Sequence, residues 1–477
     1  MALRLTLLFL LLLIIEIYAF QSIKMVVKNK WIMAIYLLIS VAMLLSVFYN
    51  RNTTNSNFSI HWIVVLSKIS GFLYFIKAIF LIENASYSAV KVVNSNKTFL
   101  SIYLFISITV ILFIVYQFTK FDRSVGQTKM TMITLGLLLL VLIPKLILTL
   151  VLFFEDICRI LSVSISKISG KSSDSFLPER RKFVSQIALG LAAIPFSSLI
   201  YGMTFGKYNY KVIKQQIFFP DLPDAFDGFK ITQISDVHSG SFDNPEKINY
   251  AIDLINEQEA DMILFTGDIV NTHAKEMLPW IDTFNRIKKY QYGKYSILGN
   301  HDYGEYVDWK TEKDKEANFK AIKGLYGKIG FNLMLNEHTY IQKGSDKIAL
   351  VGVENWGVKF KKAGDLNKAS EGLTKEEFKI LMSHDPSHWD AEVNKHPKDF
   401  HLMLSGHTHG LQFGIEIPGF FKWSPAQYVY EQWAGLYEKA GKFIYVNRGF
   451  GFHAYPGRVG IMPEISVIEL KKGKSLV

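Results

Sequence analysis

Long apolar runs dominate the first 203 residues of the chain. Each approaches the roughly 20 residues that a helix needs to cross the hydrocarbon core of a bilayer. Lys68 and Lys77 interrupt the third run, and the fifth contains Pro144 and Lys145. We interpret these positions as bundle contacts or imperfect spans, because they lack the paired acidic and basic residues of a transport pathway. The predicted spans are residues 3–20, 31–49, 62–82, 99–118, 131–154 and 183–203.

A different pattern begins at about residue 208, where short apolar segments end in polar residues and alternate with helical periodicity. One helix is well marked, because Asn244 is a suitable N-cap and Pro245 occupies the first helical position. Ile248, Ile252 and Ile255 then line one face of that helix. The pattern predicts an α/β domain with enough residues for a full core. Its expected strands are residues 229–236, 262–268, 295–298, 347–353, 378–383, 400–405 and 443–447.

The composition is that of a membrane protein, since 49% of the 477 residues are hydrophobic. A single cysteine excludes a disulfide framework and Cys-rich zinc modules. The net charge of +11 is unevenly distributed. Residues 1–203 hold 19 Lys or Arg against 7 Asp or Glu (+12), whereas residues 204–477 hold 34 against 35 (−1). A positive excess beside apolar runs is typical of loops that orient membrane helices, so we expect no nucleic-acid partner.

The placement of Lys and Arg between the apolar runs predicts the orientation in the membrane. With the N-terminus outside the cytoplasm, the inside loops hold 11 basic residues and the outside segments hold 5. Arg180-Arg181-Lys182-Phe183 before the last run resembles a twin-arginine export signal, with an ordinary basic flank as the alternative. Both interpretations place the following residues outside. If residues 62–82 do not cross, the segments before them face the opposite side of the membrane from the one assigned here. We predict a multi-pass protein of the bacterial inner membrane with an extracytoplasmic C-terminal domain.

These patterns divide the chain into four predicted parts. The first apolar run has no convincing A-x-A cleavage site after it, so we expect a retained helix rather than a signal peptide. The parts are residues 1–163, a membrane region of about five helices; 164–182, a basic linker; 183–203, the last transmembrane helix; and 208–477, the C-terminal domain.

Five polar segments stand at or just after the ends of predicted strands. Two residues that are two positions apart on an extended backbone point the same way, as expected for Asp236 with His238 and for His407 with His409. Glycine precedes three candidate ligands, where a tight turn lets the backbone approach an ion closely. The segments are Ser235-Asp236-Val237-His238, Thr266-Gly267-Asp268, Gly299-Asn300-His301-Asp302, Ser383-His384-Asp385 and Ser405-Gly406-His407-Thr408-His409-Gly410.

The candidate ligands in these segments are two Asp, one Asn and four His. Oxygen and imidazole ligands in this mixture suit Mn, Fe or Zn rather than Ca or Mg alone. Seven ligands exceed one tetrahedral site but fit two ions that share a bridging carboxylate. Two metals roughly 3.5–4 Å apart can clamp the attacking and leaving oxygens of a phosphoryl displacement. A lone histidine at a strand end is more often a hydrogen-bonded surface residue than a metal ligand. Five such segments, each at a strand end, indicate a common site.

The order D-x-H, G-D, G-N-H-D, H and G-H-T-H resembles the calcineurin-like metallophosphoesterase family across residues 230–410. Flanking stretches, among them Asn447-Arg448-Gly449-Phe450-Gly451, are similar to its branch of bacterial membrane-anchored enzymes. The resemblance implies a four-layer α-β-β-α sandwich with two mixed sheets, following an N-terminal multi-span α-helical membrane region. It also implies a metal-dependent phosphoesterase with a dinuclear metal centre.

The family resemblance implies a role for each ligand. Asp268 would bridge two divalent cations, together with a hydroxide that attacks phosphorus. The first metal would be held by Asp236, His238 and His409. The second metal would be held by Asn300, His384 and His407.

The same resemblance implies that His301 does not bind metal. It would donate a proton to the leaving-group oxygen or stabilise the charged phosphoryl group. Asp302 would orient that histidine. His301 and Asp302 are therefore the predicted catalytic pair.

Two regions after the last motif carry weaker predictions. Arg448 or Arg458 could meet a substrate phosphate, with a surface loop as the alternative, and His453 and Tyr455 lie in the same stretch. The aromatic cluster could line a groove for a lipid tail, rest on a membrane or pack in the core. The cluster comprises Phe420, Phe421, Trp423, Tyr428, Tyr430, Trp433 and Tyr437.

The leading hypothesis is a membrane-anchored phosphohydrolase that cleaves a phosphodiester, phosphomonoester or pyrophosphate bond. The membrane region suggests a lipid-linked substrate. Some relatives in the wider family cleave UDP-diacylglucosamine, a reaction that needs a cytoplasmic domain. The alternatives are a non-enzymatic metal-binding sensor or scaffold, and a transporter supported only by Lys68, Lys77 and Lys145.

Overall fold

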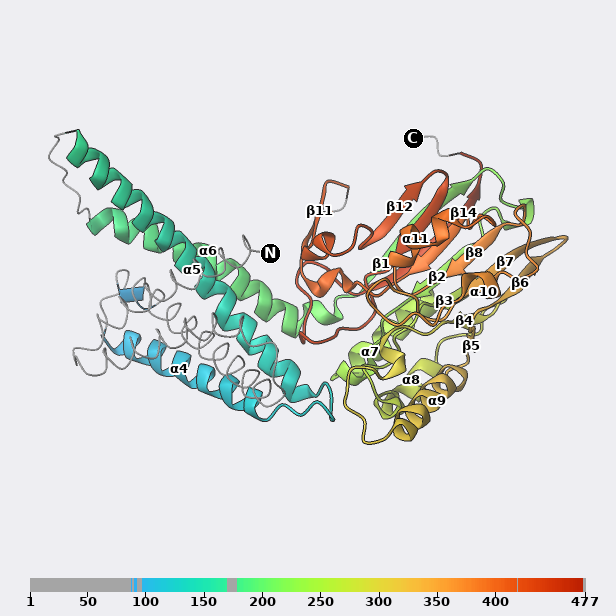
Figure 1. The fold of residues 1–477 in the computed structure, drawn as a ribbon, viewed down its shortest axis with the longest axis horizontal. Coiled ribbons are helices and arrows are strands. Elements are labelled where there is room, and N and C mark those ends of the chain that lie inside the picture. The colour runs from blue at the N-terminus through green and yellow to red at the C-terminus, as the bar shows by residue number, and fades with distance from the viewer. Residues whose placement is uncertain (1–86, 88–89, 92–96, 170–177, 418, 475–477) are drawn as a thin grey trace, which may run out of the picture. The chain divides into compact units, whose positions relative to one another are not determined.

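The computed structural model describes residues 87, 90–91, 97–169, 178–417 and 419–474 (Figure 1). The predicted spans at 3–20, 31–49 and 62–82 therefore lie outside the described residues. The chain forms two compact units. One comprises Met1–Val115 and Leu138–Ser197, and the other comprises Tyr116–Leu137 and Ser198–Val477.

Three long helices carry the apolar runs of the described N-terminal half. They are α4 (Lys97–Thr119), α5 (Lys129–Ile168) and α6 (Pro178–Thr204). Helices α5 and α6 extend into the predicted linker at 164–182 from both sides, so the described helices leave a shorter connection than the sequence pattern predicts. Serine and lysine in residues 164–168 lower the hydrophobicity of this stretch without ending α5.

Two stretches of these helices are long and apolar enough to cross a membrane, Lys129–Ser166 and Arg180–Thr204. The apolar part of α4, Phe105–Thr119, is shorter. Within the described residues, the structure thus contains two candidate spans. The six-span arrangement stays a prediction.

The C-terminal domain is built on two six-stranded sheets (Figure 1). The first has the order β1-β14-β2-β3-β4-β5, and the second has the order β12-β13-β9-β8-β7-β6. Both are mixed, because β14 is antiparallel to β2 in the first sheet, β6 is antiparallel to β7 and β12 to β13 in the second, and the remaining neighbours are parallel. This confirms the predicted pair of mixed sheets.

All seven predicted strands are present, with ends shifted by a few residues. The strands of the first sheet are β1 (Lys211–Phe219), β2 (Lys230–Ile234), β3 (Met262–Phe265), β4 (Lys294–Ser296), β5 (Asn332–Leu333) and β14 (Glu464–Lys472). Those of the second are β6 (Glu337–Lys343), β7 (Asp346–Gly352), β8 (Lys379–Met382), β9 (Leu402–Ser405), β12 (Gly435–Lys439) and β13 (Lys442–Val446). A separate hairpin consists of β10 (Ile415–Ile417) and β11 (Phe421–Trp423).

Alternation along the central strands produces the layers of the domain. On β3, Ile263 and Phe265 pack into one core cluster with the helices, whereas Met262 and Leu264 pack into the cluster between the two sheets. On β8, Leu381 faces a third cluster, which is shared with short helices on the other side. The helices on the first side are α7 (Pro245–Glu257), α8 (Ile281–Asn285) and α9 (Glu312–Lys328), and those on the second are α10 (Leu366–Ala369) and α11 (Ser387–Ala391). The core clusters thus agree with the predicted α-β-β-α order.

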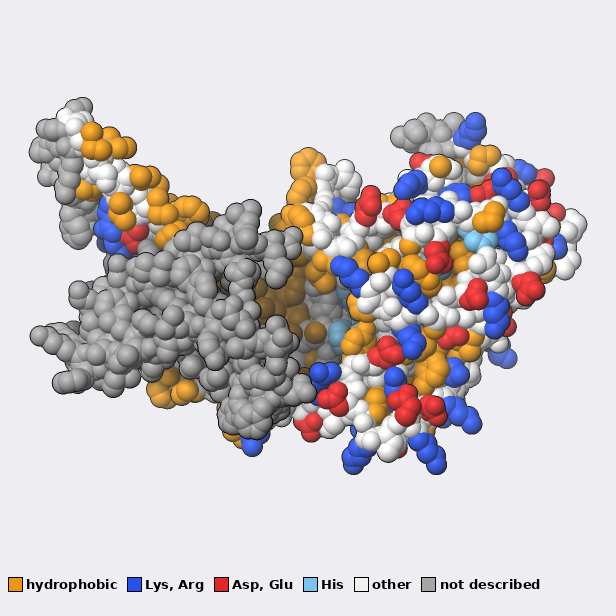
Figure 2. Space-filling view, viewed as in Figure 1, with side chains coloured by type: hydrophobic (Ala, Val, Ile, Leu, Met, Phe, Trp, Pro, Cys, Tyr) orange, Lys and Arg blue, Asp and Glu red, His pale blue; other side chains and the backbone are white. Residues whose placement is uncertain are grey.

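The predicted N-cap of α7 is confirmed. The side chain of Asn244 accepts a hydrogen bond from the backbone N–H of Lys247, and Pro245 begins the helix. Ile248, Ile252 and Ile255 are fully buried against the first sheet. Lys and Arg are interspersed with Asp and Glu over the visible face of the domain (Figure 2), as expected from its near-neutral net charge.

Candidate metal centre

The carboxyl ends of five parallel strands bring the polar segments together. Strands β2, β3 and β4 are parallel neighbours in the first sheet, and β8 and β9 are parallel neighbours in the second. The segments that follow them meet at one edge of the sandwich. One group of potential metal ligands, with donor atoms within 4.8 Å of one another, consists of Asp236, His238 and His409. A second such group consists of Asp268, His384 and His407.

The seventh predicted ligand, Asn300, joins the second group. Its Oδ1 lies 2.7 Å from Nδ1 of His407. The structure therefore brings the seven predicted ligands together, grouped as the family resemblance implies.

Asp268 belongs to the second group and also approaches His238 of the first. Its Oδ2 is 3.1 Å from Nε2 of His384 and 3.7 Å from Nε2 of His238. The side chain is 2% exposed. This is the position required of a carboxylate shared by two ions.

The ligands reach the site through left-handed backbone rather than through extended strands. Asp236 and His238 have φ of 54° and 47°, and His407 and His409 have φ of 72° and 50°. The prediction that extended backbone aligns each pair was therefore wrong in its reason, although each pair does converge. Non-glycine residues in this region are strained and cluster at functional sites. Gly406 is required for a different reason, close approach, because a Cβ there would collide with Asp236 and Ser235.

The donor set fits divalent cations. Nε2 of His238 faces Nε2 of His409 at 3.0 Å, and the fully buried Nε2 of His384 has no hydrogen-bond partner. Burial lowers the pKa of His238, which favours the neutral imidazole that binds metal. Burial also opposes the charged form of His384, but the carboxylates of Asp268 and Asp236 outweigh it and raise its pKa to about 10. The carboxylates thus favour positive charge at this position.

His301 stands beside the ligands with one ring nitrogen already engaged. Its Nδ1 lies 2.8 Å from the carbonyl oxygen of Asn271, so Nδ1–H donates there and Nε2 is left for proton exchange. Its ring stacks on Tyr306 with 4.4 Å between ring centroids. The tautomer is therefore set by a backbone carbonyl.

Asp302 does not make the predicted contact with the His301 ring. It is fully buried and accepts hydrogen bonds from the backbone N–H groups of Gly299, Asp268 and Ile269 and from the hydroxyl of Tyr326, all at 2.8–3.1 Å. Burial and the neighbouring Asp268 raise the pKa of Asp302 to about 7. Asp302 holds the loops that present Asp268 and Asn300, which corrects the predicted orientation of His301 by this carboxylate.

Three further residues contact the site, of which Tyr306 was not predicted and Tyr430 and His453 were predicted only as parts of the aromatic cluster and of the stretch near Arg448 and Arg458. The hydroxyl of Tyr306 accepts a hydrogen bond from Asn300, and the hydroxyl of Tyr430 lies 2.8 Å from Nε2 of His407. His453 stacks on His238 with 4.8 Å between centroids and forms a third potential ligand group with His238 and His301. Tyrosines and a histidine in long loops lack the strand-end context that identified the other residues.

The two candidate phosphate-binding arginines are both buried. Arg448 donates to the carboxylates of Glu464 and Glu416 at 2.5 Å each. Arg458 is fully buried, donates to the carbonyls of Gly449 and Gly451, and lies 3.1 Å from Nδ1 of His409. The alternative prediction, that these arginines lie in an exposed surface loop, is therefore wrong. Arg448 is already paired with two carboxylates in this structure.

The aromatic cluster divides between the interior and the surface. Trp433 is 4% exposed and packs in a small core cluster, whereas Phe420 is 86% exposed and Tyr428 is 76% exposed. Phe421 is exposed on the β10–β11 hairpin beside Ile415 and Ile417. Core packing is therefore confirmed for Trp433, and contact of the hairpin with a membrane stays a prediction.

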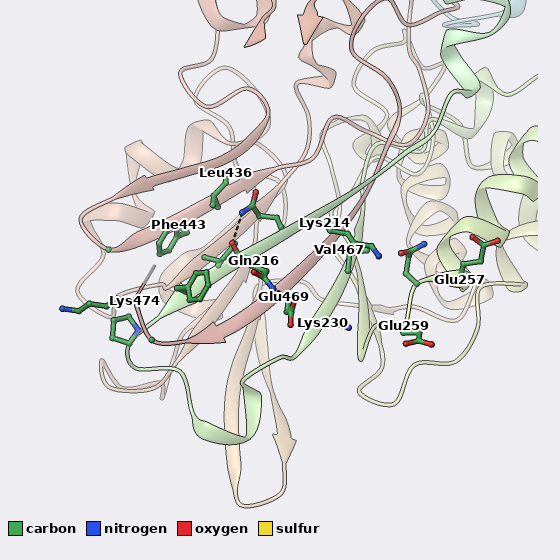
Figure 3. A pocket seen from close by; sticks show the side chains of 17 residues that line it. Lys214, Gln216, Lys230, Glu257, Glu259, Leu436, Phe443, Val467, Glu469 and Lys474 are labelled. Atoms are coloured by element: carbon green, nitrogen blue, oxygen red, sulfur yellow. Dashed lines mark hydrogen bonds between the residues drawn. The ribbon is translucent and has the colours of Figure 1, made fainter. Parts of the chain in front are cut away.

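The domain contains a cavity of about 950 Å³ that is separate from this centre. It runs along β1 and β14 and is lined by charged side chains of both signs, among them Lys214, Lys230 and Glu257 (Figure 3). Within it, Gln216 donates to Glu469 at 2.9 Å. None of the predicted site residues lines it. The cavity that touches His301 is a different one, of about 600 Å³.

The fold and the paired ligand groups define a metal-dependent phosphoesterase, a hydrolase of phosphoester bonds, and comparison with known proteins agrees. Residues 229–411 match the family model described as calcineurin-like phosphoesterase. Residues 66–207 match a second model, described as probable calcineurin-like phosphoesterase, transmembrane domain. The chain belongs to the calcineurin-like metallophosphoesterase family. The second match indicates that the protein is associated with a membrane.

Similar proteins occur in both bacteria and animals. The uncharacterized metallophosphoesterase YkuE of Bacillus subtilis is 33% identical over 257 residues, which cover 52% of this chain and 82% of that protein. A transmembrane protein with metallophosphoesterase domain from Danio rerio is 26% identical, covering 66% of this chain and 67% of that protein. Among solved structures, the NAD nucleotidase NadN of Haemophilus influenzae is 13% identical, with a TM-score of 0.31, 47% of this chain covered and 45% of that chain.

Proposed function

We propose that this protein is a membrane-anchored phosphohydrolase whose centre holds two divalent cations and cleaves a phosphoester or pyrophosphate bond. The observation that carries the proposal is Asp268, whose Oδ2 approaches His384 of its own ligand group and His238 of the other. Mn, Fe or Zn would suit the mixed oxygen and imidazole donors. When bound, two such ions supply an activated water as nucleophile and neutralise charge on the phosphoryl group.

The chain's own residues would position and protonate the substrate. Nδ1 of His301 is fixed on the carbonyl of Asn271, which leaves Nε2 to give a proton to the leaving oxygen. Tyr306 stacks on that ring and limits its rotation. Asp302 holds the backbone of Asp268 in place. The reaction needs charge stabilisation and positioning more than covalent catalysis.

The test is turnover of chromogenic phosphomonoesters and phosphodiesters by the full-length protein in detergent. We expect hydrolysis with added Mn²⁺ that is lost after chelation. His301→Ala should lower kcat by roughly 10²–10⁴-fold while both metals stay bound, because it removes only the proton donor. His396→Ala is the matched control, because the His396 ring contacts Asn367, Lys398 and Phe400 and none of the predicted site residues. Absence of turnover with metals bound would instead favour the sensor or scaffold alternative.

The substrate is proposed to be lipid-linked, because the catalytic domain is joined to a region that matches a transmembrane domain. UDP-diacylglucosamine is one candidate of this kind, but it requires a domain in the cytoplasm. The 11 to 5 distribution of basic residues supports an extracytoplasmic domain at the inner membrane.

Topology can be measured by protease protection of the C-terminal domain in intact spheroplasts. We expect digestion from the outside, with a cytoplasmic reporter protein protected as the control. Protection of the domain until the membrane is permeabilised would contradict the proposed orientation and favour the nucleotide-linked substrate.

A further inference from the structure

A cavity of about 600 Å³ opens directly beside His301. Its size is within the range of small-molecule pockets. One wall is the segment Tyr116–Leu137, which contains the end of α4, the connection to α5 and the start of α5, and belongs to the same compact unit as the catalytic domain. The other wall comes from the metal centre and includes His301, Tyr306, Phe360 and His453. The cavity is therefore continuous with the place where a substrate would react.

The wall formed by the 116–137 segment presents a group of large apolar side chains. Phe118, Phe121, Val125 and Met130 line the cavity and are each 47–54% exposed among the described residues. A concentration of large exposed apolar side chains at the mouth of a catalytic centre marks a binding surface. These four side chains suit a hydrocarbon group, and the charged Lys120 and Asp122 line the same wall beside them.

The 116–137 segment is fixed against the catalytic loops by polar contacts. Oε1 of Gln127 accepts a hydrogen bond from the backbone N–H of Ala454 at 2.8 Å, and its Nε2 donates to Oγ of Ser241 at 3.0 Å. The carbonyl of Arg123 accepts from the backbone N–H of Asp308 at 3.2 Å. Gly126 has a φ of +76°, and a Cβ there would approach Val307 to 2.6 Å. The apolar wall thus has a defined position relative to His301.

A second, smaller cavity lies near His407. It measures about 230 Å³ and is lined by Asp385, Asp390 and Glu431, with Tyr430 reaching His407. Phe360 lines both cavities, and its ring contacts that of His407 at 4.6 Å between centroids. Acidic side chains therefore line the small cavity near His407, whereas large apolar side chains line the cavity at His301.

We propose that the apolar cavity holds the hydrocarbon part of the leaving alcohol, so that the substrate is a phosphoester whose scissile oxygen carries an alkyl chain. This inference rests on the proposed function and adds the direction of cleavage. Water oxygen forms the new bond to phosphorus, and the bond between phosphorus and the alkyl oxygen breaks. That oxygen takes the proton of His301, which is restored by the proton released from water. The products are a long-chain alcohol and the remaining phosphate.

The test uses the full chain in lipid nanodiscs with two substrate series, alkyl phosphates and methyl alkyl phosphates, carrying butyl, octyl or dodecyl chains. We expect kcat/KM to rise about tenfold or more from butyl to octyl, mainly through a lower KM, since each buried methylene favours binding. Mass spectrometry of the diester products should detect methyl phosphate and the long-chain alcohol. Turnover of a chromogenic phosphoester by the same preparation reports the proposed function separately.

Val125→Asp and the milder Met130→Gln should each reduce the octyl-to-butyl ratio severalfold, because they place a polar group in the apolar wall. Leu278→Asp is the matched control, since Leu278 is 54% exposed elsewhere on the domain, and its ratio should equal that of the wild type. Equal kcat/KM for the butyl and octyl substrates, or release of alkyl phosphate and methanol, would overturn the inference. Chromogenic turnover in the same experiment would still support the proposed function. Loss of turnover on every phosphoester would reject both.

Discussion

Replacing Asp268 with asparagine is expected to abolish hydrolysis, lowering kcat/KM by about 10³-fold or more. The substituted side chain would keep the shape of the original but lose its negative charge. Its amide N–H₂ would also point toward Nε2 of His384 or His238, where a shared oxygen is needed. The loss corresponds to several kcal/mol of transition-state stabilisation, which is what bound metals typically supply. Steady-state kinetics on a chromogenic phosphoester, with Mn²⁺ in excess, provides the measurement.

The matched control for this variant is Asp253→Asn. Asp253 lies on α7 and pairs with Arg286 at the surface, with its side chain half exposed, so its replacement should leave both activity and metal content unchanged. Metal content by mass spectrometry should fall from two ions per chain to one or none in Asp268→Asn. Two ions retained with normal kinetics would show that Asp268 does not bridge them.

The sequence predicted the central strands well because each ends in a polar segment after a short apolar run. It did not predict β1 and β14, which pair in parallel across more than 250 residues of sequence. Lys211–Phe219 contains Lys and Gln among apolar residues, so its own pattern does not predict a strand. Its partner β14 is the last strand in the sequence, so no local pattern reveals the pairing. Short strands such as Asn332–Leu333 are equally invisible, because two residues show no periodicity.

The site was predictable to the extent that residue type and strand ends determine it. The seven ligands converge as expected, but the backbone that aims them does not follow the strands. Left-handed φ at Asp236, Asp268 and His409 is imposed by tertiary contacts and cannot be deduced from the residues themselves. The partner of His301 could not be predicted either, because the carbonyl of Asn271 is available whatever side chain stands there. The sequence did not predict that residues 116–137 form a wall beside His301, because the pattern there shows only the end of one helix and the start of the next.

Arg448→Met is expected to destabilise the catalytic domain by about 3–5 kcal/mol, because it leaves a buried carboxylate without its cation. Glu464 is fully buried at the start of β14, and its Oε2 accepts from the Arg448 guanidinium at 2.5 Å. Its Oε1 accepts from Tyr445 and Ser466 at 2.5 and 2.6 Å. Burial opposes ionisation of Glu464, but Arg448 and these hydrogen bonds outweigh it and lower its pKa. Urea unfolding of the full chain in detergent, followed by tryptophan fluorescence, measures the loss.

The pH dependence separates this explanation from lost packing. In the wild type the lowered pKa of Glu464 contributes stability above its ordinary value of 4.5, and that stability is lost as the pH falls through the folded-state pKa. In Arg448→Met burial is no longer opposed, so the pKa of Glu464 should rise above that of the unfolded chain. The folded variant then binds the extra proton, and its stability deficit should shrink as the pH falls from 8 toward 5. Arg286→Met, which removes a half-exposed ion pair with Asp253, should cost less than about 1 kcal/mol at both pH values. A deficit of similar size in the two variants, or one that does not change with pH, would mean that Arg448 stabilises the domain through its packing and that its charge contributes little.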